Sequence, residues 1–319
     1  MTARAPLPLL IGPTGSGKSA VAFELSRHRG VEILSVDSMK IYKRLNIGVA
    51  KPTHAESAAV CFHLIDWKEP WEHCSVAEWL AEAERVAASA QVRGAALLAE
   101  GGTAMYLKAL REGLFPGPGR DADLRAALEA EAKAHGVATL FERLKKVDAL
   151  AAGKILPNDV RRMVRALEVH ALTGRPISEQ QVQWGTLRKD WSIPTVGLLL
   201  DRQELYRRID KRVERMMAAG WLDECRALRA LDREHALSKE AQQAIGYRTL
   251  FAHLEGTLTL DEARQRIQFD THHFARKQLL WFRKFAGVKW VEVKQDEEPD
   301  RLALRVAETL ETWRTTPEE

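Results

Sequence analysis

Residues 12–19 of this chain read Gly-Pro-Thr-Gly-Ser-Gly-Lys-Ser, which fits the P-loop pattern G-x-x-x-x-G-K-[ST]. The mostly apolar residues 7–11 before it predict a buried strand, and residues 19–27 after it predict a helix. This arrangement points backbone N–H groups and the positive end of a helix at one place, so it predicts a phosphate site. The alternative is a glycine-rich connection that contains a lysine by chance. The candidate phosphate-binding residues are Gly12, Pro13, Thr14, Gly15, Ser16, Gly17, Lys18 and Ser19.

Composition sets broad limits on the class of protein. The chain has 319 residues, of which 45% are hydrophobic, enough for one large domain or two of ordinary size. Its net charge of +4 admits an anionic partner without requiring one. Cys61, Cys74 and Cys225 show no C-x-x-C spacing, which argues against a zinc knuckle or a disulfide framework and fits a reducing cytoplasm. No apolar run approaches the roughly 20 residues that span a bilayer, so we expect no membrane partner.

Two further strands are predicted to end in polar residues near the P-loop. Residues 31–36 form an apolar run that ends at Asp37, and residues 95–99 run into Gly101-Gly102-Thr103. In open α/β sheets, functional groups lie just beyond the carboxyl ends of the strands. We therefore expect Asp37 and Thr103 to lie beside the P-loop. The alternative for Asp37 is a helix or turn cap.

The middle of the chain is predicted to be a helical insertion. Prolines and glycines in residues 115–119 indicate a boundary, and residues 121–172 have a charged, helical pattern. A helix beginning at Val160 would place Arg161, Arg165 and Glu168 opposite its apolar side, with Arg162 close by. These arginines form either an anion-binding surface or an ordinary solvated face. Residues 193–200 then resume the sheet.

The C-terminal part is predicted to be helical and basic. Helices are expected over residues 204–218, 222–231, 238–254 and 260–285, with a last amphipathic helix over residues 302–313 that includes Trp313. The helix over 260–285 interleaves basic and aromatic side chains, a pattern that can hold phosphates and stack bases. His272 and His273 within it lack a partner cluster for a metal, so we expect them at the surface or against RNA.

These patterns together predict an α/β fold: a P-loop NTPase-like parallel sheet flanked by helices, with a mostly helical insertion and a helical C-terminal region. We expect residues 1–115 and 190–319 to form the core and residues 116–189 to form the insertion. The motifs N-K-x-D and L-S-G-G-Q are absent, as is an apolar strand that ends in Asp-Glu. Those absences argue against a GTPase, an ABC ATPase and a helicase. Nucleotide and metabolite kinases, which use ATP, share the remaining plan.

Separated stretches of the chain resemble the tRNA dimethylallyltransferases, also called tRNA isopentenyltransferases or IPP transferases. The stretches run in order over residues 9–290, and together they are very specific although each is weak. Five positions depart from the pattern: Lys40 replaces glutamine, Ala104 glycine and Leu280 threonine, and His272 and His273 replace arginine. The matching stretches are residues 12–19, 37–39, 41–42, 47–48, 50–52, 101–103, 106–110, 157–159, 165–169, 173–178, 245–248, 276–278 and 281–283.

The resemblance implies an activity and a prenyl donor. It implies transfer of a dimethylallyl group from dimethylallyl diphosphate to N6 of the adenosine after the anticodon, in tRNAs that read codons starting with U. Asp37 would accept the N6 proton, and Thr103 would bind the bridging oxygen of the donor. Arg208 or Arg212 would join Lys18 at the diphosphate, and Ser19 would reach it through Mg2+. The resemblance thus assigns the phosphate of the P-loop to a leaving group rather than to ATP.

The resemblance also implies a surface for the tRNA anticodon stem-loop, and we expect the protein to be a monomer. Three alternatives stay open: a P-loop kinase that transfers phosphate from ATP to a small metabolite, an RNA-binding module without activity, and a transferase that acts on free adenine nucleotide. The residues expected to contact tRNA are Asp37, Ser38, Met39, Lys40, Thr103, Arg125, Arg161, Arg162, Met163, Val164, Arg165, Gln243, Ala244, Ile245, Gly246, Tyr247, Arg248, Arg276, Lys277, Gln278, Trp281 and Arg283.

Overall fold

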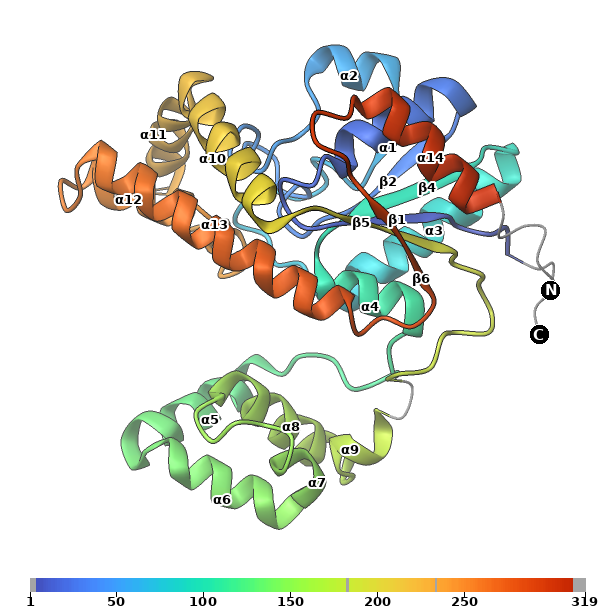
Figure 1. Ribbon diagram of the computed structural model, residues 1–319. Coiled ribbons are helices and arrows are strands. Elements are labelled where there is room, and N and C mark those ends of the chain that lie inside the picture. The colour runs from blue at the N-terminus through green and yellow to red at the C-terminus, as the bar shows by residue number, and fades with distance from the viewer. Residues whose placement is uncertain (1–3, 182–183, 233, 312–319) are drawn as a thin grey trace. The chain divides into compact units, whose positions relative to one another are not determined.

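A six-stranded parallel sheet forms the centre of the larger of two compact units (Figure 1). The computed structural model describes residues 4–181, 184–232 and 234–311. The strand order is β3-β2-β4-β1-β5-β6, and every neighbouring pair is parallel. The predicted α/β class with a P-loop-like parallel sheet is confirmed. The strands are β1 (Leu9–Ile11), β2 (Glu32–Val36), β3 (Phe62–His63), β4 (Leu97–Gly101), β5 (Thr195–Leu199) and β6 (Val288–Glu292).

Helices cover both faces of this sheet (Figure 1). Parallel strands require crossover connections, and right-handed crossovers place a helix on opposite faces when the chain moves in opposite directions along the sheet. The chain moves one way from β1 through α1 to β2, and the other way from β3 through α3 to β4. In this unit, the helices before β5 are α1 (Lys18–Arg29), α2 (His54–Ala59), α3 (Val76–Arg93) and α4 (Ala104–Glu112).

One face of the sheet packs on α1 and on the last helix, α14 (Pro299–Glu311). Leu10 of β1, Val21 of α1 and Val306 of α14 belong to one buried apolar cluster. Because strands of a parallel sheet are covered on both faces, their side chains are apolar in long runs, and this explains why the sequence pattern revealed them. The helices between β5 and β6 are α10 (Arg202–Ala218), α11 (Trp221–Asp232), α12 (Tyr247–Leu254) and α13 (Leu260–Phe282), with a 3-10 turn, η1 (Ala241–Gln243).

The smaller unit, residues 112–187, is helical and has a core of its own. Leu128, Leu140, Leu144 and Leu167 are among the buried side chains of this core. No described helix in either unit is both long and apolar enough to cross a membrane. The helices that lie in the smaller unit are α5 (Ala122–His135), α6 (Val137–Val147), α7 (Ala149–Ala152), α8 (Val160–Thr173) and α9 (Ile177–Gln180).

The structure differs from the predicted elements at four places. Strand β6 was not predicted, because its residues lie partly exposed at the sheet edge. Helix α2 was also missed; Thr53 begins it with a capping box. Residues 62–67 predict a short strand, but β3 ends at His63 because Leu64 adopts a positive φ of 60°. The helix expected over residues 238–254 is broken at Gly246, whose φ is 92°. Trp313 lies outside the described residues.

Candidate active site

The P-loop connects β1 to α1 as the motif requires. Gly15 and Gly17 have positive φ angles of 82° and 88°, a conformation that glycine adopts without a steric penalty. Gly17 is also the N-cap residue of α1, and it has no side chain that could bond the first amides of the helix. The turn therefore directs uncapped backbone N–H groups and the positive end of α1 at the same place, which is the arrangement that binds phosphate.

Strand register brings three connections to one edge of the sheet. Gly101 of β4 lies opposite Ile11 of β1 and also opposite Val36 of β2. The chain therefore leaves three adjacent strands at one level, into the P-loop, into the Gly-Gly-Thr turn and into Asp37. As predicted, Asp37 and Thr103 lie on the same edge as the phosphate loop.

Glycines at the end of β4 permit a close approach between these connections. A Cβ atom on Gly101 would lie 2.1 Å from the carbonyl oxygen of Val36. A Cβ atom on Gly102 would lie 2.6 Å from Nε2 of Gln278 and 3.6 Å from Cε of Lys18. Any side chain at Gly101 would therefore push β2 and β4 apart, and one at Gly102 would displace the amide of Gln278.

Asp37 and Thr103 fix the turn that follows β2. Oδ1 of Asp37 accepts hydrogen bonds from the amides of Met39 at 2.8 Å and Lys40 at 3.2 Å. Oγ1 of Thr103 accepts the amide of Ser38 at 3.0 Å and donates to Oγ of Ser38 at 3.3 Å. Asp37 thus does serve as a turn cap, the alternative that the sequence left open. This role uses one carboxylate oxygen, and it holds the side chain in a fixed orientation at the sheet edge.

Gln278 of α13 connects the P-loop with the Gly-Gly-Thr turn. Its Oε1 accepts the amide of Thr14 at 2.8 Å, and its Nε2 donates to the carbonyl of Gly102 at 2.7 Å. Gln278 is 5% exposed. Sequence reasoning assigned this residue to tRNA contact; its burial and both of its bonds instead show that it holds two loops of the site together.

Two arginines of α10 adjoin the P-loop. Nη1 of Arg212 donates to Oγ1 of Thr14 at 3.2 Å. A Cβ atom on Gly17 would lie 3.8 Å from Nη1 of Arg208, and Nε of Arg208 is held by Glu204 at 2.6 Å. Because the two arginines are four residues apart, they lie on the same side of α10. Both candidates for the diphosphate contact therefore adjoin the loop.

A buried carboxylate, Glu100, lies beneath the P-loop and was not predicted. Glu100 is 2% exposed, and its Oε1 accepts hydrogen bonds from Nζ of Lys40 at 3.2 Å and Oγ of Ser19 at 3.2 Å. Burial acts to raise the pKa of Glu100, but the ammonium groups of Lys40 and Lys18 hold it below its usual value. The signal in the sequence was a charged residue at the end of the apolar run 95–99.

Lys18 has an unusually low affinity for its proton. Burial lowers the pKa of Lys18 from 10.5 to about 8. Glu100 opposes this shift, whereas the cationic groups of Lys40 and Arg212 add to it. Asp37 also acts on Lys18, so three cations and two carboxylates meet around the loop. This excess of positive charge suits a polyanionic ligand.

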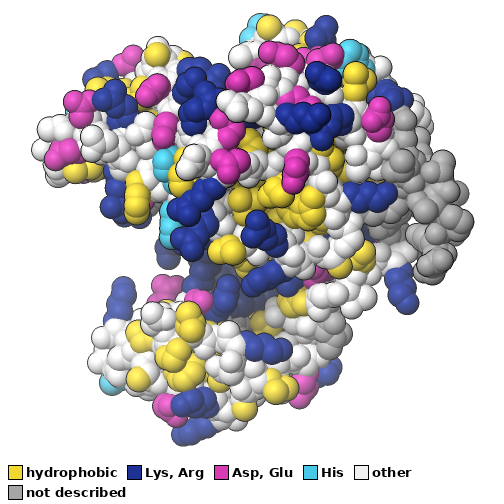
Figure 2. All heavy atoms as spheres, viewed as in Figure 1, with side chains coloured by type: hydrophobic (Ala, Val, Ile, Leu, Met, Phe, Trp, Pro, Cys, Tyr) yellow, Lys and Arg dark blue, Asp and Glu magenta, His cyan; other side chains and the backbone are white. Residues whose placement is uncertain are grey.

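Most of the basic side chains that were expected to contact tRNA in the larger unit are exposed. Arg276, Lys277 and Arg283 of α13 and its C-terminal end are exposed, as is Arg248 of α12. Trp281 lies among them and is 38% exposed. Figure 2 shows Lys and Arg side chains grouped over α10 and α13. Gln243 is exposed and Ile245 is half-buried.

Other residues expected to contact tRNA are buried. Ala244 and Tyr247 are 2% and 1% exposed. A Cβ atom on Gly246 would lie 2.2 Å from the Trp221 ring. The hydroxyl of Tyr247 donates to Glu224 at 2.7 Å. Direct side-chain contact with RNA is therefore wrong for Ala244 and Tyr247, because their side chains pack inside the protein.

The smaller unit requires a similar correction. Met163 and Val164 are buried in its core, so their side chains offer no surface to RNA. Glu168, expected on the polar side of α8, is fully buried and accepts bonds from Arg125 at 2.8 Å and Arg165 at 2.6 Å. Arg125 and Arg165 are therefore tied to a carboxylate, whereas Arg161 and Arg162 are exposed.

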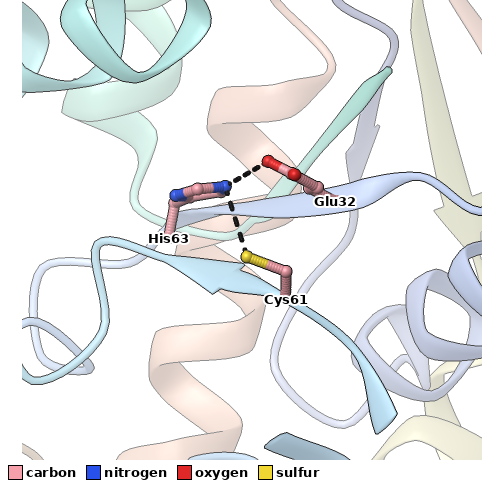
Figure 3. Close-up of side chains that lie close together, drawn as sticks. All are labelled: Glu32, Cys61 and His63. Carbon is pink, nitrogen blue, oxygen red and sulfur yellow. Dashed lines mark hydrogen bonds and ion pairs between the residues drawn. The ribbon is translucent and has the colours of Figure 1, made fainter. Parts of the chain in front are cut away.

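A second cluster of titratable groups lies at the opposite end of β2 (Figure 3). Nε2 of His63 lies 2.7 Å from Oε2 of Glu32 and 3.6 Å from Sγ of Cys61. These three groups could hold a metal ion. However, the guanidinium of Arg93 donates to the same Oε2 of Glu32 at 2.7 Å. A cation is thus already in place, and the cluster lies at the amino end of β2, away from Asp37.

Comparison with known proteins identifies the family. The sequence model described as IPP transferase matches residues 40–285. The chain belongs to the IPP transferase family. This match begins at Lys40, so the P-loop and Asp37 lie before it.

Relatives extend the similarity over the rest of the chain. The chain is 41% identical over 286 residues to a tRNA dimethylallyltransferase of Geobacter sulfurreducens, covering 90% of this chain and 91% of the relative. It is 42% identical over 308 residues to a tRNA dimethylallyltransferase of Roseiflexus castenholzii, covering 96% and 99%. Both relatives of this IPP transferase family member are matched over nearly their full lengths.

Solved structures of the family have the same fold. The full-length tRNA isopentenylpyrophosphate transferase of Bacillus halodurans is 34% identical, with a TM-score of 0.68 and coverage of 97% of this chain and 98% of that one. A eukaryotic dimethylallyltransferase acting on tRNA is 22% identical, with a TM-score of 0.82 and coverage of 98% and 81%. The second likeness supports the fold alone.

Proposed function

We propose that this protein transfers a dimethylallyl group from dimethylallyl diphosphate to N6 of the adenosine that follows the anticodon in tRNAs reading codons that start with U. The observation that carries the proposal is the meeting of the P-loop, Asp37 and Thr103 at one sheet edge, in a chain 41% identical to a tRNA dimethylallyltransferase. Relatives of that name favour prenyl transfer over the kinase alternative. We also infer a cytoplasmic reaction, because Cys61, Cys74 and Cys225 form no disulfide and show no C-x-x-C spacing.

The P-loop side of the site would bind the leaving group. The amides around Gly15 and Gly17 receive the diphosphate, and Lys18 contributes a positive charge. Arg212, bonded to Thr14, and Arg208, beside Gly17, complete the cationic wall. As the bond between the allylic carbon and oxygen breaks, negative charge grows on the diphosphate. Groups that are already oriented toward this charge lower the barrier.

The Asp37 side would serve the acceptor. The target adenosine leaves the stacked anticodon loop, and its N6 attacks the allylic carbon as the diphosphate departs. Oδ1 of Asp37 is bonded to two amides, and its other oxygen takes the proton that N6 loses. An exocyclic amine is a poor nucleophile, so a positioned base and proximity matter. Thr103 would bind the bridging oxygen, exchanging its bond to Ser38 for one to the donor.

Magnesium was expected at Ser19, and the surroundings of Ser19 bear on this. A metal ion there needs a lone pair of Oγ. Nζ of Lys40 donates to that oxygen at 3.4 Å, and Oγ donates to Glu100. A fixed ammonium thus stands beside Ser19, where a Mg2+ ion would have to approach. The residues present therefore do not leave this position open for a metal ion.

The tRNA surface would consist of exposed basic side chains. In the larger unit these include Arg248, Arg276, Lys277 and Arg283, with Trp281 available for stacking, and in the smaller unit Arg161 and Arg162. Phosphate contacts of this kind make binding depend on salt. In a plot of the logarithm of affinity against the logarithm of salt concentration, each contact adds nearly one unit to the slope. We expect the double variant Arg276→Ala/Arg283→Ala to reduce the salt slope of tRNA affinity by about one to two units. An unchanged slope would contradict this surface.

Mass analysis of nucleosides tests the function. The protein is incubated with dimethylallyl diphosphate and unmodified tRNA, and the digested tRNA is examined for adenosine that carries one added dimethylallyl group. ATP with tRNA, and dimethylallyl diphosphate with free AMP, are the parallel reactions. The proposal is supported if the tRNA gains modified adenosine and neither parallel reaction gives a product. Modification of free nucleotide only, or phosphate transfer from ATP, would contradict it.

A further inference from the structure

The ammonium group of Lys40 is buried beneath the P-loop, between Glu100 and Ser19. The Lys40 side chain is 8% exposed and its Nζ lies 3.2 Å from Oε1 of Glu100 and 3.4 Å from Oγ of Ser19. Glu100 is anchored at the end of β4, next to the Gly-Gly-Thr turn, and its side chain is 3% exposed. A buried ammonium with a carboxylate on one side and a hydroxyl on the other is held in one orientation.

The serine of the P-loop pattern is the residue whose hydroxyl binds Mg2+ in nucleotide-binding P-loops. Such an ion neutralises phosphate charge at the mouth of the loop. In this chain the same hydroxyl, Ser19 Oγ, is engaged by an ammonium and a carboxylate. A divalent cation arriving at Ser19 would meet the positive charge of Lys40 at close range, in a site that water screens poorly. Mg2+ and Lys40 therefore compete for one position.

We propose that the Lys40 ammonium, anchored by Glu100 beside Ser19, takes the place of the divalent cation at the P-loop, so that the site binds diphosphate without a metal. Lys40 is then a binding residue for the leaving group, and Glu100 is the positioning residue that keeps it under the loop. This inference rests on the proposed function, because it needs the P-loop to receive a diphosphate.

The charges beneath the loop are consistent with this role. Lys18, Lys40 and Arg212 carry three positive charges here, and Glu100 and Asp37 carry two negative ones. The floor therefore carries a net positive charge before any metal binds. Lys40 and Asp37 belong to the same turn, and Oδ1 of Asp37 accepts the amide of Lys40 at 3.2 Å. The backbone therefore also fixes the position of Lys40.

Binding of inorganic pyrophosphate, measured by calorimetry, tests the inference without relying on turnover. Each protein is titrated once in EDTA and once in excess Mg2+. For the wild type we expect the two affinities to agree within about threefold. For Lys40→Gln we expect affinity in EDTA to fall about tenfold or more, with Mg2+ restoring it, because Ser19 and Glu100 then offer a metal two oxygen ligands.

Two further variants keep the outcome interpretable. Lys43→Gln is the matched control, since Lys43 belongs to the same connection but pairs with Glu69 at the surface; it should bind like the wild type. Glu100→Gln keeps an oxygen that can accept from Lys40 but removes the negative charge beside it, so it should bind pyrophosphate in EDTA more tightly than the wild type. Thermal melting checks that each variant is folded.

The results separate the inference from the proposed function. Lys40 does not replace the metal if Mg2+ raises the pyrophosphate affinity of the wild type tenfold or more over that in EDTA. The same conclusion follows if folded Lys40→Gln binds pyrophosphate in EDTA as tightly as the wild type does. If the wild type binds no pyrophosphate with or without Mg2+, the P-loop is not a diphosphate site, and the proposed function fails together with the inference.

Discussion

Two buried glutamates, Glu100 beneath the P-loop and Glu168 in the helical unit, are each surrounded by two cationic side chains. Glu168 faces Arg125 and Arg165 and also accepts the amide of Asp121 at 2.8 Å, so its oxygens are well satisfied. Glu100 faces Lys40 and Lys18, and its surroundings keep an excess of positive charge. The difference teaches that a buried carboxylate stabilises a fold when its partners fully satisfy it, and serves a ligand when cations remain in excess.

The bonding of the two arginines explains this contrast. Arg125 presents two N–H groups to the two oxygens of Glu168, both at 2.8 Å, which is the planar fork that suits a carboxylate. Lysine has no such fork, and Lys40 divides its ammonium between Glu100 and Ser19. A point charge of this kind can be shared with an arriving phosphate, whereas the fork of Arg125 is already used.

The largest effect should come from a change at Asp37, in the candidate active site. Asp37→Asn keeps an oxygen for the amides of Met39 and Lys40 but cannot accept the N6 proton. We expect the single-turnover rate of prenyl transfer to fall by about 10²- to 10⁴-fold with little change in melting temperature. Asp37→Ala should show the same loss of rate together with a lower melting temperature, since it also loses the cap. A rate within about threefold of the wild type in Asp37→Ala would show that Asp37 is not the base.

Glu168→Gln should act on stability instead. The bonds from Arg125 and Arg165 hold the pKa of Glu168 at about 2 although its burial opposes the charged form. The shift from 4.5 corresponds to about 3 kcal/mol of stability near neutral pH. We expect hydrogen exchange of amides in α5 and α8 to show local destabilisation of this order. Glu142→Gln, at an exposed carboxylate of α6, is the matched control. Unchanged protection in Glu168→Gln would remove the contrast between the two glutamates.

Acid should reproduce the effect of that variant in the wild type. The folded pKa of Glu168 lies below the unfolded one, so its contribution to stability is fully present above about pH 4.5. It is lost as the pH falls from 4.5 toward about 2. Hydrogen exchange of the helical unit in urea, measured at several pH values between 4.5 and 2, gives the slope of its stability against pH. The slope should be smaller in Glu168→Gln, and an equal slope in both proteins would assign the acid sensitivity to other carboxylates.

The P-loop should show a pH dependence of its own, at alkaline pH. Lys18 has its pKa lowered to about 8, so the ligand-free protein gains stability as the pH rises from about 8 to 10.5, where only the unfolded chain keeps this proton. Pyrophosphate needs the charged lysine, and we expect its affinity to fall by up to about tenfold per pH unit above 8. Lys18→Met is the control, because any pH dependence that remains in this variant comes from the ionisation of pyrophosphate and not from Lys18. Equal pH profiles in the two proteins would contradict a titrating Lys18.

The parallel sheet and the edge that bears the site could be predicted from the sequence, because buried strands are long apolar runs and the P-loop motif has a fixed context. Asp37 and Thr103 followed from the ends of those runs. The Lys40–Glu100 pair and the Gln278 bridge could not be predicted in this way, since each joins residues far apart in the chain. Periodicity also placed Glu168 on a polar face, because the spacing of α8 does not reveal that Arg125 of another helix covers that face.

The fate of the diphosphate is the measurement that tests the central claim most directly. The claim is that the P-loop holds a leaving group and transfers no phosphoryl group. With dimethylallyl diphosphate labelled in both phosphates and unmodified tRNA, we expect one intact pyrophosphate to be released for each adenosine that gains a dimethylallyl group. Label on the tRNA, or release of single phosphates in step with the reaction, would contradict the claim.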